Sequence, residues 1–335
     1  MPRFGAHLSI AGGVERAVER AREIRADCLQ LFVKPPQQWR FQPLHDKDAE
    51  RFRSAATGAG LAPLVGHASY LVNLATPDET LWEKSAACLL AEWDRAERLG
   101  LAYLVLHPGS PCSREHLSLQ GSHTGSGEAA GLARVAAALN RLHRERPGQR
   151  CRILLETTAG AGSTLGGRLE HLKYLVETCE AGPSASSALR DLATGGPAVE
   201  AGDRLGIAID TCHLFVAGYD LRTPSAVDET LGKIDEAVGL GRVGVVHAND
   251  AKGALGSHRD RHEHIGRGKI GRQGFRALVN HPALAALPFI LETPKRDARP
   301  SRASRSTQRL STGGSNDGRE MDPVNLGVLR RLAKG

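Results

Sequence analysis

Paired cysteines are missing from this sequence. Its six cysteines stand singly, with no C-x-x-C pair of the kind found in zinc knuckles and redox motifs. Unpaired cysteines are typical of proteins kept in a reducing compartment, so we expect an intracellular, cytoplasmic location. Any metal site in the chain should therefore be built from ligands other than thiolate pairs.

Long apolar runs are missing as well. No stretch approaches the roughly 18 consecutive apolar residues of a membrane-spanning helix. The opening residues, MPRFGAHLSIAGG, contain no apolar region typical of a signal peptide. We therefore expect no membrane partner.

A dinucleotide-binding glycine turn is also missing. The segment GAHLSIAGG places two glycines after the first predicted strand, but their spacing differs from G-x-G-x-x-G. This difference argues against an open, doubly wound sheet that binds a dinucleotide.

The composition that remains is that of a large globular protein. The chain has 335 residues, 41% hydrophobic and 24% charged, which favours one domain over 1–335, although two small domains would also be possible. Lys and Arg outnumber Asp and Glu by 44 to 37, and the formal charge is +7. This excess suits an anionic partner such as nucleic acid, but a composition simply rich in Arg and Ala would explain it equally well.

Short apolar runs alternate with helix-period segments along the whole chain, which indicates repeated βα units. An example of the helical segments is 78–100, with an acidic start and a final glycine. Eight parallel strands with crossover helices close most naturally into a single (β/α)₈ TIM barrel of the α/β class. The predicted strands are 3–8, 28–33, 62–67, 102–107, 151–156, 205–210, 242–248 and 287–292.

Three segments rich in Ser, Gly and Pro lack periodicity and are predicted to be flexible loop insertions: 111–128, 180–203 and 295–320. The third follows the eighth strand and should leave the barrel on the face where barrel active sites lie. It is basic, and we expect it to add phosphate contacts. Its basic residues include Lys295, Arg296, Arg299, Arg302, Arg305 and Arg309.

Polar residues end six of the predicted strands, at the positions where barrel enzymes carry their reactive groups. One such residue alone is more often a hydrogen-bonded structural group, whereas six converging on one ring indicate a site. The six are His67, His107, Glu156, Asp210, His247 and Glu292.

Imidazoles mixed with carboxylates suit zinc, manganese and related ions, and this set exceeds what one tetrahedral zinc can use. His213 adds a donor after the sixth strand, and Asp260 and His262 add two after the seventh. In an extended D-x-H segment both side chains point to one face, so this pair could chelate one ion. We expect the flanking His258 and His264 to be solvated loop residues.

With these residues identified, the chain resembles the endonuclease IV family of apurinic/apyrimidinic endonucleases. The resemblance extends from residue 5 to 294, fades in the three insertions, and returns weakly near the C-terminus. It is carried by GAHLSIAGG, HASYLVNLA, LVLHPGS, LLETTAGAGSTLG, IDTCHLFVAGYDLRT, VVHANDAK, DRHEHIGRGKIG and ILETP.

The resemblance implies three zinc ions per chain, with manganese as an alternative at one or more sites. His67, His107 and Glu156 match the ligands of the first ion. Glu156, Asp210, His247 and Glu292 match those of the second, with Glu156 bridging the two. His213, Asp260 and His262 match the third, and catalysis is expected to centre on Glu156, Glu292 and His107.

The resemblance also implies a class II apurinic/apyrimidinic endonuclease of the deoxyribonuclease IV (phage T4-induced) type. Such an enzyme would cleave double-stranded DNA 5′ to an abasic site, leave a 3′-hydroxyl and remove 3′-blocking groups. We expect it to work as a monomer and to meet DNA in the nucleoid. Backbone amides in the glycine-rich segments 160–167 and 266–271 could approach phosphates.

Lesion recognition is expected to depend on residues that fill the gap left by the missing base. Tyr70 and Leu71 match such a wedge, although an aromatic and a leucine packing on the barrel rim would look the same. Gln37 stands where some relatives carry an inserting Arg, and it lacks the charge and planar fork of that residue.

Two other functions remain open. A sugar isomerase or epimerase of the same fold would also bind divalent metals at strand ends, but it would not need the larger set of ligands. A lesion-binding protein that uses its metals only for stability would carry the same ligands without cleaving DNA.

Overall fold

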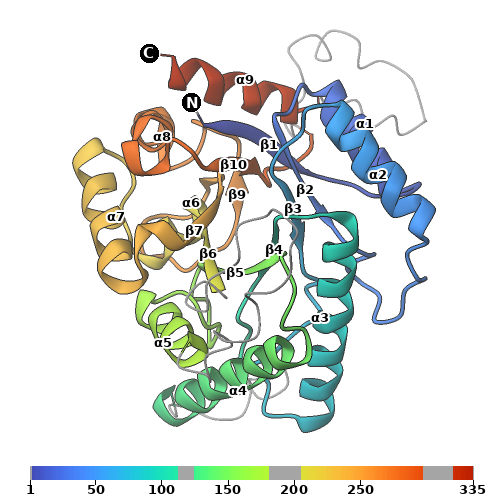
Figure 1. The fold of residues 1–335 in the computed structure, drawn as a ribbon. Coiled ribbons are helices and arrows are strands. Elements are labelled where there is room, and N and C mark those ends of the chain that lie inside the picture. Colours follow the sequence, from blue (N-terminus) through green and yellow to red (C-terminus); the bar gives the residue numbers. More distant parts are fainter. Residues whose placement is uncertain (1, 112–123, 181–204, 297–319, 335) are drawn as a thin grey trace, which may run out of the picture.

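The computed structural model describes residues 2–111, 124–180, 205–296 and 320–334, and eight parallel strands in these ranges close into a barrel (Figure 1). The strand order is β1-β10-β7-β6-β5-β4-β3-β2, with β1 and β10 closing the ring. The strands are β1 (Arg3–Leu8), β2 (Cys28–Phe32), β3 (Leu64–His67), β4 (Tyr103–Leu106), β5 (Arg152–Glu156), β6 (Leu205–Asp210), β7 (Val243–His247) and β10 (Pro288–Leu291). This architecture confirms the predicted TIM barrel, and each predicted strand overlaps an observed one to within two residues at either end.

Helices surround the barrel and connect its strands (Figure 1). They are α1 (Glu15–Glu23), α2 (Asp46–Gly58), α3 (Glu79–Leu99), α4 (Thr124–Glu145), α5 (Leu169–Glu180), α6 (Thr211–Ala217), α7 (Pro224–Val238), α8 (Gly271–Asn280) and α9 (Asp322–Ala333). Two short 3₁₀ helices cover Leu240–Arg242 and Pro282–Leu284. No helix within the described ranges combines the length and apolar content needed to cross a membrane.

The end residues of α3 show why the segment 78–100 is helical. The Asp78 side chain accepts a hydrogen bond from the Leu81 amide at 2.8 Å, and this satisfies a donor that a helix start leaves free. Gly100 adopts a φ of 71°, a left-handed conformation that stops the helix at low steric cost. Both predicted end signals are therefore confirmed.

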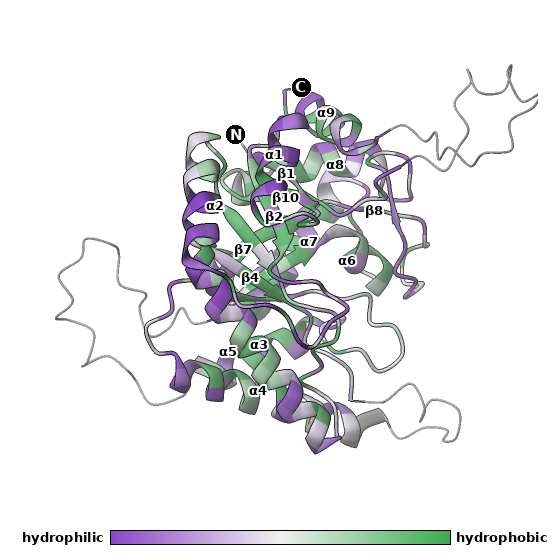
Figure 2. Ribbon diagram, turned by 90° about the vertical axis from the view of Figure 1, so that its right-hand side faces the viewer, coloured by the Kyte–Doolittle hydropathy of each residue, from purple (hydrophilic) through white to green (hydrophobic). Residues whose placement is uncertain are grey.

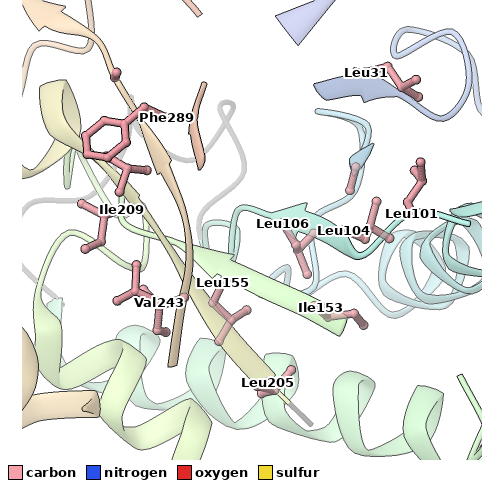
Figure 3. Packing of buried hydrophobic residues seen from close by; sticks show 14 of the residues in the cluster. Leu31, Leu101, Leu104, Leu106, Ile153, Leu155, Leu205, Ile209, Val243 and Phe289 are labelled. Atoms are coloured by element: carbon pink, nitrogen blue, oxygen red, sulfur yellow. The ribbon is translucent and has the colours of Figure 1, made fainter. Parts of the chain in front are cut away.

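Along each strand, side chains alternate between the apolar layer under the helices and the apolar interior of the barrel. Residues facing outward pack against the helices, as Figure 3 shows for Ile153 and Leu155 of β5. Hydrophobic residues are concentrated in the strands, while the outer surfaces of helices such as α2 are hydrophilic (Figure 2). Inward-facing residues form a separate layer inside the barrel: Cys28, Val65, Val105, Leu154, Ala208, Val245 and Ile290.

The inner apolar layer indicates where the polar strand-end residues lie. Six of the seven members stand two positions before a polar residue at or next to the strand end, and Cys28 stands two positions before Gln30 inside β2. Side chains two apart on a strand share a face. The inner apolar layer therefore forms the floor beneath a ring of polar side chains at the carboxyl end of the barrel.

A two-stranded antiparallel sheet follows β7 and was not predicted. It pairs β8 (Asp250–Ala251) with β9 (His262–Glu263). The sheet returns the chain toward the barrel and so brings Asp260 and His262 back to its rim.

The predicted insertions coincide largely with 112–123, 181–204 and 297–319, which lie outside the described residues. The prediction of a loop over 111–128 is wrong for 124–128, because these residues form the first turn of α4. They precede an Ala-rich, strongly helix-forming segment that propagates the helix backward. The two ends of the third segment lie together, since Arg296 and Glu320 form an antiparallel bridge and Lys295 Nζ lies 2.8 Å from Asp322 Oδ2.

Candidate metal centre

The strand-end residues meet at the carboxyl end of the barrel. Glu156, Asp210 and His247 are fully buried, and His67 is nearly so. His107 remains open, with 32% of its side chain exposed. The structure therefore brings together the polar residues that the sequence placed at strand ends, with one imidazole facing solvent.

A first group joins His67, His107 and Glu156. Glu156 Oε2 lies 2.9 Å from His107 Nε2 and 3.2 Å from His67 Nε2. The ligand atoms of the three residues all lie within 4.8 Å of one another. This spacing suits a single cation bound between them.

A second group shares Glu156 with the first. Its other oxygen, Oε1, lies 3.0 Å from His247 Nδ1, and Glu292 Oε2 lies 3.4 Å from the same nitrogen. Asp210 completes the group. Each oxygen of the Glu156 carboxylate therefore faces a different group, as a bridging ligand would require.

A third group lies beside the second. Asp260 Oδ2 is 3.3 Å from His213 Nε2, and Asp260 Oδ1 is 3.4 Å from His262 Nε2. Asp210 Oδ2 lies 3.7 Å from His262 Nε2, which places Asp210 between the second and third groups. All nine residues singled out as ligands thus lie in one continuous cluster.

Cys212 also lies within reach of the third group, close to Asp260 and His262. The sequence did not predict it as a ligand, because a single cysteine lacks the paired spacing that marks a thiolate metal site. Burial raises the pKa of this thiol in the metal-free protein, so it keeps its proton near neutral pH.

Backbone hydrogen bonds fix which nitrogen of three histidines faces the cluster. His67 Nδ1 donates to the carbonyl of Ala68 at 2.7 Å, and His213 Nδ1 donates to the carbonyl of Thr157 at 2.9 Å. His262 Nδ1 donates to a carbonyl at 3.1 Å, and its buried Nε2 makes no hydrogen bond with any described residue. Each ring therefore turns its Nε2 toward the cluster, and this is the atom that could bind a metal once its proton is lost.

In the metal-free cluster, ionised carboxylates lie next to imidazoles that bind protons, so protons occupy the place that metal cations could take. Burial would raise the pKa of Glu156, but the imidazoles of His247 and His107 hold it well below its usual value. Burial would lower the pKa of His247, but Glu292 and Glu156 raise it to about 9. The carboxylates therefore stay ionised and attract positive charge, which a proton or a metal ion can supply.

A shell of polar residues behind the ligands was missed from the sequence. Gln30 Nε2 donates to Glu292 Oε1 at 2.6 Å, while its Oε1 accepts from His247 Nε2 at 2.8 Å. His7 Nδ1 lies 3.0 Å from the same glutamate oxygen, and Asn249 Nδ2 donates to Asp210 Oδ2 at 2.6 Å. Gln30 and His7 interrupt apolar strands, and that interruption was the signal that could have revealed them.

Two expectations for the loop after β7 are wrong. His264 is buried rather than solvated, and its Nδ1 lies 3.2 Å from Asn325 Nδ2. The amides of 266–271 are not directed at a phosphate, because four of them point to the buried carboxylate of Asp250. His258 is exposed, and its Nδ1 donates to the carbonyl of Ala159 at 2.8 Å.

The residues expected to contact DNA lie on the rim of the cluster. Tyr70 is 66% exposed, and its ring centroid lies 5.6 Å from that of His67 and 5.3 Å from that of Phe32. Leu71 is half-buried beside it, and Gln37 is exposed in the loop that follows β2. The three residues are thus available to a ligand that approaches the open face.

Comparisons with known proteins agree with this geometry. The family model described as xylose isomerase-like TIM barrel matches residues 18–186 and 197–312. A probable endonuclease 4 from Chloroflexus aurantiacus is 42% identical over 337 residues, covering 100% of this chain and 99% of its own length. Another, from Chloroflexus aggregans, is 44% identical, covering 88% of this chain and 92% of its own length.

Two solved structures with similar folds differ in how similar their sequences are to this chain. The crystal structure of endonuclease IV from Thermus thermophilus aligns with a TM-score of 0.73 at 35% identity and covers 99% of both chains. A D-tagatose 3-epimerase-like protein aligns with a TM-score of 0.63 but only 18% identity, covering 99% of this chain and 97% of its own, and this likeness shows the fold alone.

Proposed function

Because the chain belongs to the endonuclease IV family of xylose isomerase-like TIM barrels, we propose that it is a DNA-repair nuclease acting at abasic sites. The proposed reaction is hydrolysis of the phosphodiester 5′ to the abasic sugar, which leaves a 3′-hydroxyl. The observation that supports it most strongly is the continuous cluster in which Glu156 and Asp210 join three ligand groups.

The donor set fits three divalent cations, which we propose to be zinc, with manganese as an alternative. His67, His107 and Glu156 would hold the first. The second would be held by Glu156, Asp210, His247 and Glu292, and the third by His213, Asp260 and His262. Bound there, such ions would acidify a water for in-line attack on phosphorus and neutralise charge on the phosphoryl oxygens.

The protein's own residues would provide position and orientation. The Glu156 carboxylate, buried and ionised, would keep two ligand groups at a fixed separation. Gln30 and His7 would hold Glu292 in place by hydrogen bonds, so that little reorganisation is needed during the reaction. The exposed face of His107 would mark the side from which the phosphate approaches. We propose Glu156, Glu292 and His107 as the catalytic residues.

Substrate selection would come from the rim. Tyr70 and Leu71 would fill the space of the missing base, because unstacking costs least where the base is already lost. Gln37 would add a hydrogen-bonding contact. Blocked 3′ ends present the same phosphate chemistry to the same cluster, so we propose that they are also substrates. The partner would be double-stranded DNA met inside the cell, and the enzyme would act as a monomer.

The structure gives no specific support to an isomerase. The likeness to epimerases shows a shared fold, and function depends on the site rather than on the fold. A one- or two-metal isomerase would not need the third group formed by His213, Asp260 and His262.

The test uses a duplex with one tetrahydrofuran abasic analogue, which cannot be cleaved by β-elimination. We expect a single nick 5′ to the analogue with a 3′-hydroxyl product, no nick in the undamaged duplex, and about three metal ions per chain. Chelation should abolish nicking, and zinc should restore it. Tight binding of the lesion without a nick would instead identify a lesion-binding protein. If the protein neither binds nor cleaves the abasic duplex, the proposal is overturned.

A further inference from the structure

A buried ion pair lies beneath the rim. Lys34 follows β2 and is 1% exposed, while Glu92 of α3 is fully buried. Lys34 Nζ lies 3.1 Å from Glu92 Oε1. Burying two charges is costly, and an apolar pair of similar volume often stabilises a protein equally well. The pair therefore calls for an explanation beyond stability, and neither residue belongs to the metal cluster.

The lysine holds the loop that carries Gln37. Its Nζ donates to the carbonyl of Gln38 at 2.6 Å and also contacts the carbonyl of Pro35 at 3.4 Å. These two carbonyls flank Gln37, whose side chain is exposed. The buried ammonium thus fixes the backbone beneath an exposed residue.

The glutamate holds the loop that carries the aromatic wedge. Glu92 Oε2 accepts a hydrogen bond from the Ser69 amide at 2.8 Å. The Ser69 hydroxyl donates to the carbonyl of Pro36 at 2.6 Å and accepts from the Leu71 amide at 3.3 Å. The loop after β3 is therefore tied both to the ion pair and directly to the loop after β2, with Tyr70 between the tied residues.

From these contacts we propose that Lys34 and Glu92 are positioning residues for lesion recognition. They set the spacing between Gln37 on one loop and Tyr70 and Leu71 on the other, so that the three side chains meet the damaged duplex in a preformed arrangement. Loops that are already ordered lose less conformational entropy when DNA binds, so binding is stronger. This inference rests on the proposed function, because it assumes that these side chains contact DNA.

The main test is the double variant Lys34→Met/Glu92→Met, which removes both charges together and leaves no unpaired ion in the core. We expect it to fold and to bind the same number of metal ions as the wild type. Its KM for the tetrahydrofuran duplex should rise about tenfold while kcat changes less than about twofold, because the loops hold substrate and transition state alike. Its Kd for that duplex should rise by a similar factor.

A second variant keeps the proposal testable if the double variant fails to fold. Ser69→Ala removes the direct hydroxyl link between the loops without touching a charge, and we expect KM to rise about threefold at unchanged kcat. The matched control is Asp94→Asn on the same helix, which weakens the pair that Asp94 forms with Arg146 and should leave KM unchanged.

The outcomes separate this inference from the proposed function. If the wild type nicks the duplex and every folded variant has a KM within about twofold of it, the inference is overturned. A fall in kcat or in metal content at unchanged KM would also overturn it, since the pair would then act on the cluster. Failure of the wild type to nick the duplex would instead overturn the proposed function.

Discussion

Glu156 Oε1 lies 3.0 Å from Nδ1 of His247, 91 positions further along the chain. The other oxygen of the same carboxylate faces His67 and His107. Among the cluster residues that the structure describes, Glu156 alone has one oxygen next to the imidazoles of the first group and the other oxygen next to the imidazole of the second group. Loss of this carboxylate should therefore affect both groups at once.

Glu156→Gln tests this relationship. An amide keeps the size of the side chain but removes the charge, and one of its two ends becomes a donor that cannot bind a cation. We expect cleavage of the tetrahydrofuran duplex to fall about a thousandfold or more, with fewer metal ions per chain. Glu263→Gln, one residue from His262 but in none of the ligand groups, is the control and should retain activity. Near wild-type turnover in Glu156→Gln would contradict the bridging role.

Tyr70→Ala tests the wedge. The side chain is largely exposed, so its removal should change the free energy of unfolding by less than about 1 kcal/mol. Aromatic stacking on DNA is worth about 1–3 kcal/mol, so the Kd for the abasic duplex should rise roughly 5- to 150-fold. Tyr174→Ala removes another exposed tyrosine, on α5, and should leave this Kd unchanged. Equal binding by the two variants would remove Tyr70 from the recognition surface.

The barrel could be predicted from the sequence because its determinants are local and repeated. Each strand is a short apolar run, and each inward position follows from alternation along the strand. Since parallel strands end at one edge of the sheet, the polar residues after Val65, Val105 and Leu154 had to converge. Ligand positions at strand ends were thus accessible without any knowledge of distances.

The parts that could not be predicted depend on contacts between distant segments. Nothing near Asp250 in the chain indicates that its carboxylate would take up the amides of 266–271, which then cannot serve a phosphate. The burial of His264 likewise depends on Asn325, 61 residues away on α9. The pairing of Lys34 with Glu92 required α3 to lie behind two loops, and the sequence shows only two ordinary charged residues.

Asp250→Asn tests the support of the loop after β7. The carboxylate is fully buried, and it accepts bonds of 2.8 to 3.0 Å from four amides. Replacing one oxygen with an amino group would set donor against donor, so we expect a loss of about 3 kcal/mol in the free energy of unfolding. Asp235→Asn is the control, because that exposed side chain accepts from a single amide, and it should cost less than about 1 kcal/mol. Urea unfolding would measure both, and equal losses would show that the Asp250 contacts are unimportant.

The metal-free protein should lose stability as the pH rises from 6.5 to 9. Burial lowers the pKa of His247, but Glu292 and Glu156 raise it from 6.5 to about 9. A raised pKa adds stability that is fully present below 6.5 and is lost as the pH passes through the folded value. The pKa values of His67 and His213 are raised too, so these residues act in the same direction.

Urea unfolding of chelated protein at pH 6.5, 7.5 and 8.5 would measure this effect. From His247 alone we expect a fall of about 2 kcal/mol between pH 6.5 and 8.5. Saturating zinc should flatten the dependence, because the metal takes the place of the protons. The variant His247→Asn should show a smaller slope when chelated, and a slope equal to that of the wild type would contradict the assignment.

Removal of 297–319 tests whether the basic segment contributes to DNA binding. The segment carries five arginines, and its ends are held together by the bridge between Arg296 and Glu320, so a short Gly-Ser linker can join them. The five are Arg299, Arg302, Arg305, Arg309 and Arg319. For every phosphate that the shortened protein no longer neutralises, the slope of log K against log salt should fall by about 0.9, while kcat stays constant because the ligand groups are untouched. A full-length variant with the five arginines replaced by serine separates charge from chain length. It should reproduce the change in slope if charge is the cause, whereas an unchanged slope in both proteins would show that the segment does not bind phosphates.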